Sequence, residues 1–164
     1  MRGLIDGALS TLGVVIGAFS SPSALLIISA AFSGAIANGF SNILAAFSAE
    51  RTEGYKKIQE IEDAMITKLK GSAQEKHMRR KVMKNGIIDG ISTIIGGIIP
   101  ILPILFFTGI SALYASIAVV TVLMGVLGVY SGFYAKENLV LAGAKMVIFA
   151  LITAGVCIGV EMLL

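Results

Sequence analysis

Two aspartates lie inside apolar segments, at equivalent places of a short internal repeat. Residues 3–17 read GLIDGALSTLGVVIG and residues 86–100 read GIIDGISTIIGGIIP, which aligns Asp6 with Asp89. An ionised carboxylate near the middle of a membrane costs about 2.5–3.5 kcal/mol, so by default it marks an ion path or a polar partner. Two carboxylates in one cavity would bind a divalent cation or exchange protons. The alternative is that each aspartate caps or packs the start of its own helix.

Two asparagines lie four residues apart in the second apolar segment. On a helix, Asn38 and Asn42 share one face, so that both amides would point in the same direction. Amide and carboxylate oxygens suit hard or borderline divalent cations. We therefore interpret Asp6, Asp89, Asn38 and Asn42 as candidates for the lining of a transport path. The alternative is that the two amides only hydrogen-bond between helices.

Other reactive residues indicate no further chemistry. Glu161 lies close to the last residue and can reach water, and the Lys145 side chain can extend to the membrane surface. His77 lies among basic residues, and Cys157 is best explained as a small buried side chain. The sequence contains no Gly-rich phosphate loop, paired-cysteine pattern or nucleophile motif. We therefore expect no enzyme, no permanently bound cofactor and no nucleic-acid partner.

The elements that position these residues are apolar helices. The chain is 56% hydrophobic and 14% charged, with a mean hydropathy of +0.90, whereas ordinary soluble domains are about 25% charged. A helix needs roughly 20 apolar residues to cross a membrane, and backbone groups in lipid must be paired within the helix. We therefore expect an all-α membrane protein with five transmembrane helices. The corresponding segments are 3–21, 24–48, 86–107, 110–135 and 139–163.

The repeat extends beyond the two aspartate motifs. Residues 39–50 resemble residues 125–136, so that the first and second spans are repeated as the third and fourth, with a fifth helix added. Both copies begin on the same side of the membrane, which predicts a parallel repeat. The expected units are 1–49, 50–85, 86–137 and 138–164.

The segment 50–85 carries most of the charge. It contains 10 of the 13 Lys and Arg residues, and its formal charge is 10 − 6 = +4. The excess of basic residues predicts a cytoplasmic connector, with the N-terminus inside and the C-terminus outside. Spaced apolar residues predict that it is helical up to Gly71, with a second short helix over 74–83. Its simplest role is to fix orientation and to contact anionic membrane lipids. The chain as a whole suits a prokaryotic plasma membrane.

Three stretches resemble the vacuolar iron transporter family. Residues 5-IDGALSTLGVVIGA-18 resemble the signature of its first span, 37-ANGFSNILAAFSAE-50 its second, and 96-GGIIPILPILFF-107 its third. Five spans with a charged segment after the second also fit the family. The resemblance covers essentially the whole chain. It implies a homodimer that moves Fe²⁺, and often Mn²⁺, out of the cytosol in exchange for protons.

The resemblance also implies roles for individual residues. It places Asp6 on the ion path, and it implies that the segment after the second span collects metal. The implied metal ligands are Asp6, Glu50, Glu53, Glu60, Glu62, Asp63 and Met65. Two positions depart from the family pattern, since a path methionine falls on Asn42 and a glutamate falls on Ala46. The alternative function is a non-transporting relative that binds lipid or a protein through its basic connector.

Overall fold

The computed structural model describes residues 1–21, 23–65 and 73–163, and all regular secondary structure in these ranges is helical. This confirms the expected all-α class. The helices are α1 (Arg2–Gly17), α2 (Ala24–Met65), α3 (Ala73–Ile98), the short 3₁₀ helix η1 (Ile99–Ile101), α4 (Leu102–Phe106), α5 (Ile110–Ala135) and α6 (Leu139–Leu163).

Four stretches of helix within the described residues are long and apolar enough to cross a membrane. They are Ala24–Ala49 in α2, Arg80–Phe106 across α3, η1 and α4, all of α5, and all of α6. The chain is therefore an integral, multi-pass membrane protein. The first expected span is α1, whose 16 residues reach about 24 Å, less than the roughly 30 Å of a bilayer core.

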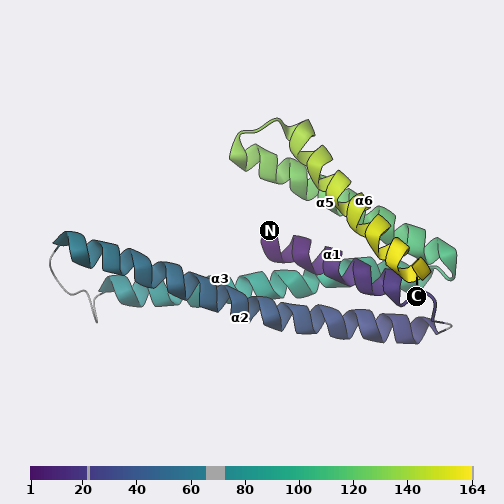
Figure 1. The fold of residues 1–164 in the computed structure, drawn as a ribbon, viewed down its shortest axis with the longest axis horizontal. Helices are drawn as coiled ribbons and strands as arrows, with labels where there is room; N and C mark the ends of the chain where they lie inside the picture. The colour runs from purple at the N-terminus through teal and green to yellow at the C-terminus, as the bar shows by residue number, and fades with distance from the viewer. Residues whose placement is uncertain (22, 66–72, 164) are drawn as a thin grey trace.

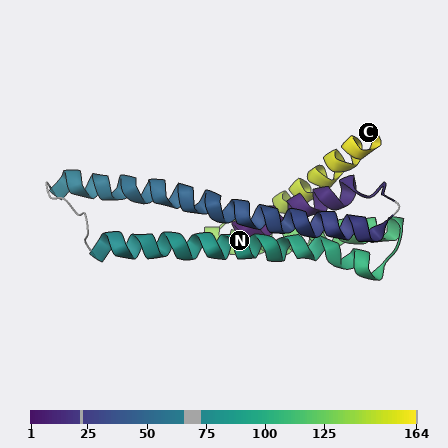
Figure 2. The same cartoon turned by 90° about the horizontal axis from the view of Figure 1, so that it is seen from below.

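The helices form two hairpins joined through α1. Figures 1 and 2 show α2 and α3 side by side, with the C-terminal end of α2 and the N-terminal end of α3 projecting beyond the rest of the molecule. Helices α5 and α6 form a second hairpin, which diverges from the first in Figure 1. Helix α1 lies between the hairpins, and its N-terminus points in the same direction as the projecting end.

The expected charged connector is helical where the structure describes it, and it is continuous with the apolar parts of α2 and α3. Helix α2 continues without interruption from its apolar part to Met65, and the expected short helix over 74–83 is the beginning of α3. Residues 49–65 contain no proline and one glycine, Gly54, and most of the others are good helix formers. The sequence therefore gives the helix no reason to end at the membrane surface. The expected break at Gly71 lies outside the described residues.

Helix α1 forms the centre of the hydrophobic core although it is shorter than the apolar spans. One side of α1 packs against α5 and α6, and Val15 packs against α2, η1, α4 and the start of α5. The first cluster consists of Ala8, Leu12, Ile16, Leu113, Val120, Met124, Ala150 and Ala154, and the second of Val15, Ile27, Ala31, Ile101, Ile104 and Ala112. Because α1 contacts both hairpins, residues on α1 can be held rigidly between them.

Helices α1 and α3 approach each other so closely that only glycine fits at their contact. A Cβ atom added to Gly3 would overlap the backbone carbonyl of Asp89, and one added to Gly7 would overlap that of Thr93. On the other side, a Cβ at Gly96 would overlap the carbonyl of Leu4. Small residues at such contacts are how helices associate in lipid. The two helices run in the same direction, and their contact brings both copies of the repeated motif together.

Candidate functional site

The carboxylate of Asp6 is the centre of a polar cluster formed by α1, α2 and α3. Its Oδ2 atom accepts hydrogen bonds from the side-chain amides of Asn38 at 3.0 Å and Asn42 at 2.7 Å. The two asparagines lie one turn apart on α2, as their spacing predicts. The structure thus brings together three of the four residues that the sequence indicates for a transport path.

Two hydroxyl groups complete the cluster. The Asn38 amide also donates to Ser10 Oγ at 2.8 Å, and the Asn42 amide donates to Thr93 Oγ1 at 2.8 Å. Ser10 and Thr93 occupy equivalent positions of the sequence repeat. Their hydroxyls donate in turn to backbone carbonyls of their own helices, those of Gly7 and Asp89. Sequence reasoning missed both hydroxyls as members of the site, although their alignment in the repeat was a usable signal.

Within the described part of the chain, three side-chain oxygens of the cluster accept no hydrogen bond. A side-chain amide has two N–H donors, and each asparagine uses both of them within the cluster. Among the described residues, no hydrogen bond reaches the Oδ1 atoms of Asp6, Asn38 and Asn42. The amide orientation is set by Asp6, because the reversed amides would place oxygen against the carboxylate. Carboxylate and amide oxygens are the ligand type that hard divalent cations prefer.

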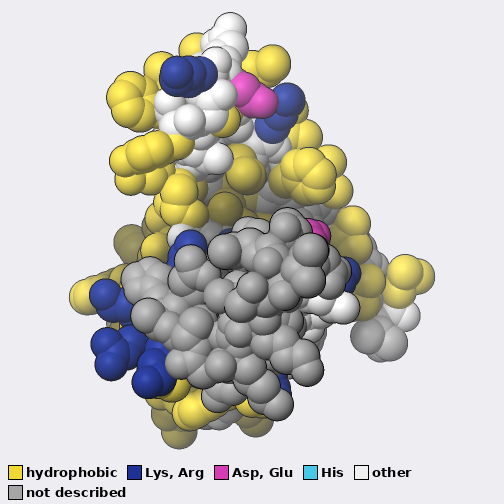
Figure 3. Space-filling model, turned by 90° about the vertical axis from the view of Figure 1, so that its left-hand side faces the viewer, with side chains coloured by type: hydrophobic (Ala, Val, Ile, Leu, Met, Phe, Trp, Pro, Cys, Tyr) yellow, Lys and Arg dark blue, Asp and Glu magenta, His cyan; other side chains and the backbone are white. Residues whose placement is uncertain are grey.

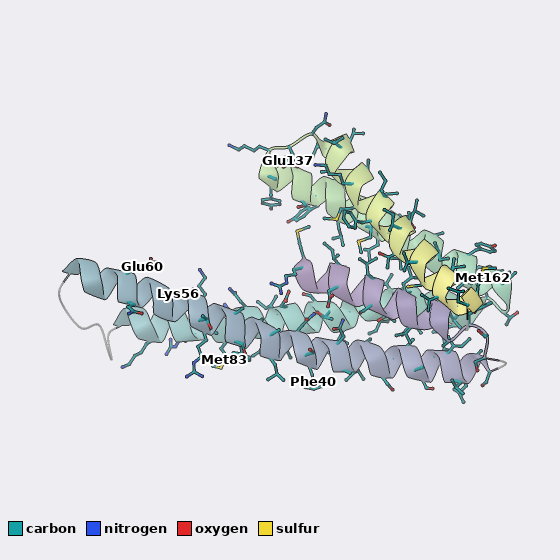
Figure 4. All side chains as sticks on the ribbon, viewed as in Figure 1. Phe40, Lys56, Glu60, Met83, Glu137 and Met162 are labelled. Carbon is teal, nitrogen blue, oxygen red and sulfur yellow. The ribbon has the colours of Figure 1, made fainter. Side chains whose placement is uncertain are left out.

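Asp6 is exposed on the surface of a single chain, whereas Asn38 and Asn42 are half-buried. Large apolar side chains such as Phe40 and Leu44 are exposed on the side of α2 that faces away from these asparagines, and Figure 4 labels Phe40. A charged group on an otherwise apolar surface of a membrane protein is costly unless protein or water covers it.

Asp89 occupies a different environment. It is half-buried, and its Oδ1 accepts a hydrogen bond from the backbone N–H of Gly3 at 2.9 Å. Gly3 belongs to the first turn of α1, whose N–H groups have no partner within the helix. A carboxylate at this place also interacts favourably with the helix dipole. Asp89 therefore caps α1, the neighbouring helix, and not the helix that carries it.

The candidate ligands beyond the apolar part of α2 are described only in part. Glu60 is exposed on the projecting part of α2 (Figure 4). The backbone of the other candidates is helical, but their side chains lie outside the described part of the structure; these are Glu50, Glu53, Glu62, Asp63 and Met65. Among the described residues, no group of three or more His, Cys, Asp and Glu side chains is placed to hold a metal ion.

The opposite end of the molecule has a simpler polar contact. Glu161, near the C-terminal end of α6, accepts a hydrogen bond from the hydroxyl of Ser20 at 2.9 Å. Met162 marks this end in Figure 4, far from the projecting parts of α2 and α3. This carboxylate is separate from the Asp6 cluster, and it fastens the end of α6 to the loop after α1.

The apolar helices and the polar cluster around Asp6 define a helical, multi-pass membrane protein with a polar site between α1, α2 and α3. Residues 53–162 match the sequence model of the VIT family. The chain is also 44% identical over 164 residues to an uncharacterized protein from Methanocaldococcus jannaschii, an alignment that covers 98% of this chain and 86% of that protein. The chain therefore belongs to the VIT family, the vacuolar iron transporter family. The family match does not include Asp6, Asn38 and Asn42, so the argument for these residues rests on their geometry.

Proposed function

We propose that the protein moves a divalent metal, Fe²⁺ or Mn²⁺, out of the cytosol in exchange for protons. Membership of a transporter family supports the class of function, and the M. jannaschii relative is uncharacterized and supplies no substrate. The observation that carries the proposal is the convergence of two amides on one carboxylate oxygen of Asp6, while the Oδ1 atoms of the three side chains accept no hydrogen bond from the described residues. A cation would supply the positive charge that this arrangement lacks.

Each residue of the cluster has a role in the proposal. Asp6 binds the cation with its carboxylate and takes up a proton when the cation leaves. Asn38 and Asn42 hold Asp6 in place through their N–H groups and offer their free oxygens to the cation. Asp89 positions α1 by binding the N–H of Gly3, so its contribution to the path is indirect.

The exposure of Asp6 supports a homodimer. A single chain leaves this carboxylate on its surface, where lipid would surround it at high cost. A second copy that covers α1 and α2 would enclose the site between two chains. In the same proposal α1 also crosses the membrane and brings the number of transmembrane helices to five. The two copies of the repeat are parallel, and the projecting end of α2 and α3 lies in the cytoplasm.

The charges of the projecting end are separated in a way that suits metal collection. Residues 50–65 of α2 contain three basic and five acidic residues, a formal charge of 3 − 5 = −2. Residues 73–85 of α3 contain five basic residues and one acidic residue, a formal charge of 5 − 1 = +4. The acidic part contains Glu60 and the other implied ligands. We propose that this part of α2 attracts divalent cations, although the connector as a whole is basic.

Uptake into proteoliposomes that contain a pH-sensitive dye tests the proposal. For the wild type, we expect Fe²⁺ or Mn²⁺ entry accompanied by proton movement in the opposite direction. Asp6→Asn should lower the uptake rate by roughly tenfold or more, because an amide lacks the charge that offsets the dehydration of the cation. Glu161→Gln is the matched control, since it removes a carboxylate at the other end of the molecule. Unchanged flux in well-folded Asp6→Asn protein would show that Asp6 does not bind the ion.

A further inference from the structure

The outer face of α3 changes from cationic to apolar along one side of the helix. Arg80, Lys81 and Lys84 are exposed, and the exposed isoleucines that follow them on this side are Ile87, Ile88, Ile91 and Ile95. At 3.6 residues per turn, most of these positions lie on the half of the helix opposite Gly86 and Gly90, with Arg80 and Ile87 at the edge of that half. The two glycines pack against Ile43 of α2. The side chains of this outer face therefore point away from the hairpin partner.

The packing of α2 against α3 locates the membrane boundary on this face. Gly39 lies against Ile94, Ile43 lies against Gly90, and Phe47 lies close to Gly86. Continuing this antiparallel register by two residues places Ala49 approximately level with Lys84. The first charged residues after the apolar run of α2 are Glu50 and Arg51. The change from isoleucine to lysine on α3 therefore occurs at the level at which α2 also leaves the apolar layer.

The three cations lie at the depth of lipid headgroups. At 1.5 Å per residue, Arg80 lies about 6 Å beyond Lys84 along the helix, and a headgroup layer is about 5–8 Å thick. Figure 3, which views the molecule from the projecting end, shows Lys and Arg side chains bordered by hydrophobic side chains. Met83 marks this level of α3 in Figure 4.

We infer that the outer face of α3 binds an anionic phospholipid, independently of whether the protein transports metal. The phosphate lies against Arg80, Lys81 and Lys84, and an acyl chain lies along the isoleucines that follow. The guanidinium group of Arg80 can form two parallel hydrogen bonds to one phosphate. The charge balance favours α3 over α2 as the site, because residues 73–85 carry a formal charge of 5 − 1 = +4 and residues 50–65 carry 3 − 5 = −2.

The headgroup part of the site is tested with the full-length protein in nanodiscs of phosphatidylcholine and phosphatidylglycerol. Native mass spectrometry of the released protein counts the phosphatidylglycerol molecules that stay bound. We expect the triple variant Arg80→Gln, Lys81→Gln, Lys84→Gln to bind phosphatidylglycerol more weakly by roughly fivefold for each cation removed. The matched control is Lys56→Gln, Lys136→Gln, Lys145→Gln, which removes the same charge at other exposed positions and should bind as the wild type does.

Three outcomes of this experiment would overturn the inference. An equal loss of phosphatidylglycerol binding in the control variant would show that binding depends on the net charge of the protein and not on a site on α3. Full retention in the triple variant would place the lipid elsewhere. Displacement of phosphatidylglycerol by inorganic phosphate alone would show an anion site that does not need the acyl chain.

The acyl-chain part of the site is tested by fluorescence, because the chain contains no tryptophan. Ile88→Trp introduces a single reporter on the outer face of α3, and Ile152→Trp introduces one at an exposed position of α6. Phosphatidylglycerol with brominated acyl chains should quench Ile88→Trp more strongly than brominated phosphatidylcholine does, whereas Ile152→Trp should not distinguish them. Equal quenching of Ile88→Trp by both lipids would contradict the preference for an anionic headgroup. Absence of quenching by either lipid would show that acyl chains do not reach this face, and it would overturn the inference.

Discussion

Asp6 and Asp89 occupy the same position in two copies of one motif but have different partners. Asp6 is exposed and accepts hydrogen bonds from the amides of Asn38 and Asn42 on α2. Asp89 is half-buried and accepts a hydrogen bond from the backbone of Gly3 on α1. One carboxylate therefore belongs to a cluster of polar side chains, and the other binds the N-terminal end of a helix. The two aspartates therefore have different roles, although they occupy equivalent positions of the repeat.

The different roles follow from how the two helices are staggered. Gly3 lies opposite Asp89 of α3. The residue that corresponds to Gly3 in the repeat is Gly86, three residues before Asp89. This stagger of nearly one helical turn directs the two motifs towards different neighbours. Gly86 lies close to Ile43 and Phe47 of α2, whereas Gly3 contacts α3.

The hydroxyls of the two motifs make equivalent hydrogen bonds, whereas the carboxylates do not. Ser10 accepts a hydrogen bond from Asn38, and Thr93 accepts one from Asn42. Each hydroxyl also donates to a carbonyl three or four residues earlier in its own helix. The polar cluster therefore has contributions from both motifs, and only one of the two acidic side chains belongs to it.

The largest expected effect comes from separating the two motifs. Gly7→Ala places a methyl group against the carbonyl of Thr93, so that α1 and α3 must move apart. Backbone atoms cannot yield as a side chain can, and we expect the variant to lose roughly 3 kcal/mol or more of stability. Denaturant unfolding in lipid–detergent micelles measures the loss. Gly17→Ala on the same helix is the control, because nothing lies within 4 Å of the added Cβ. Equal stability of the two variants would contradict the close contact.

The next-largest effect distinguishes the two carboxylates, because one variant should lose stability and the other should lose transport. Asp89→Ala removes the acceptor for the Gly3 N–H, and a hydrogen bond of this kind contributes about 1–2 kcal/mol. We therefore expect Asp89→Ala to unfold at a lower denaturant concentration than the wild type, while each folded molecule transports metal at the wild-type rate. Asp6→Ala should show the opposite pattern, with lost transport and a smaller change in stability. If Asp89→Ala abolishes flux in fully folded protein, Asp89 belongs to the ion path.

The two asparagines provide a finer test of the Asp6 environment. Asn42 makes the shorter bond to Asp6 and connects it to the buried hydroxyl of Thr93, whereas Asn38 connects it to the exposed Ser10. We expect Asn42→Ala to cost about 1 kcal/mol and Asn38→Ala about half of that. A double-mutant cycle with Asp6→Asn measures how much of each value depends on the carboxylate. Equal coupling energies between Asp6 and each asparagine would show that it does not matter whether the hydroxyl partner is the buried Thr93 or the exposed Ser10.

The sequence predicts the helices and part of the site for the same physical reason. Backbone and polar side chains need partners in lipid, so apolar runs indicate helices, and Asp6, Asn38 and Asn42 are expected to meet other polar groups. The hydroxyl of Thr93 escaped this reasoning because a helical threonine can bond its own backbone, as it does here to Asp89.

The partner of Asp89 was not predictable from the pattern of residues. It depends on the stagger of α1 against α3, which is set by backbone contacts at Gly3, Gly7 and Gly96. The continuity of α2 from its apolar part to Met65 was also not predictable from hydropathy, because a hydropathy pattern marks where the apolar part ends and carries no information on where the helix ends.

The smallest expected effect compares two buried threonines that face the contact between α1 and α3. Thr93 uses its hydroxyl for Asn42 and for a backbone carbonyl, whereas the hydroxyl of Thr11 has no hydrogen-bond partner among the described residues and lies close to Gly97. Threonine and valine have nearly the same shape, so each substitution removes the hydroxyl with little change in packing. We expect Thr93→Val to lose about 0.6 kcal/mol, a typical value for a hydrogen bond between membrane helices. Thr11→Val should be neutral or slightly stabilising, because the desolvated hydroxyl that it removes has no bond to lose. The same unfolding measurement compares the two variants, and a loss for Thr11→Val as large as that for Thr93→Val would show that Thr11 has a bonding partner in the membrane.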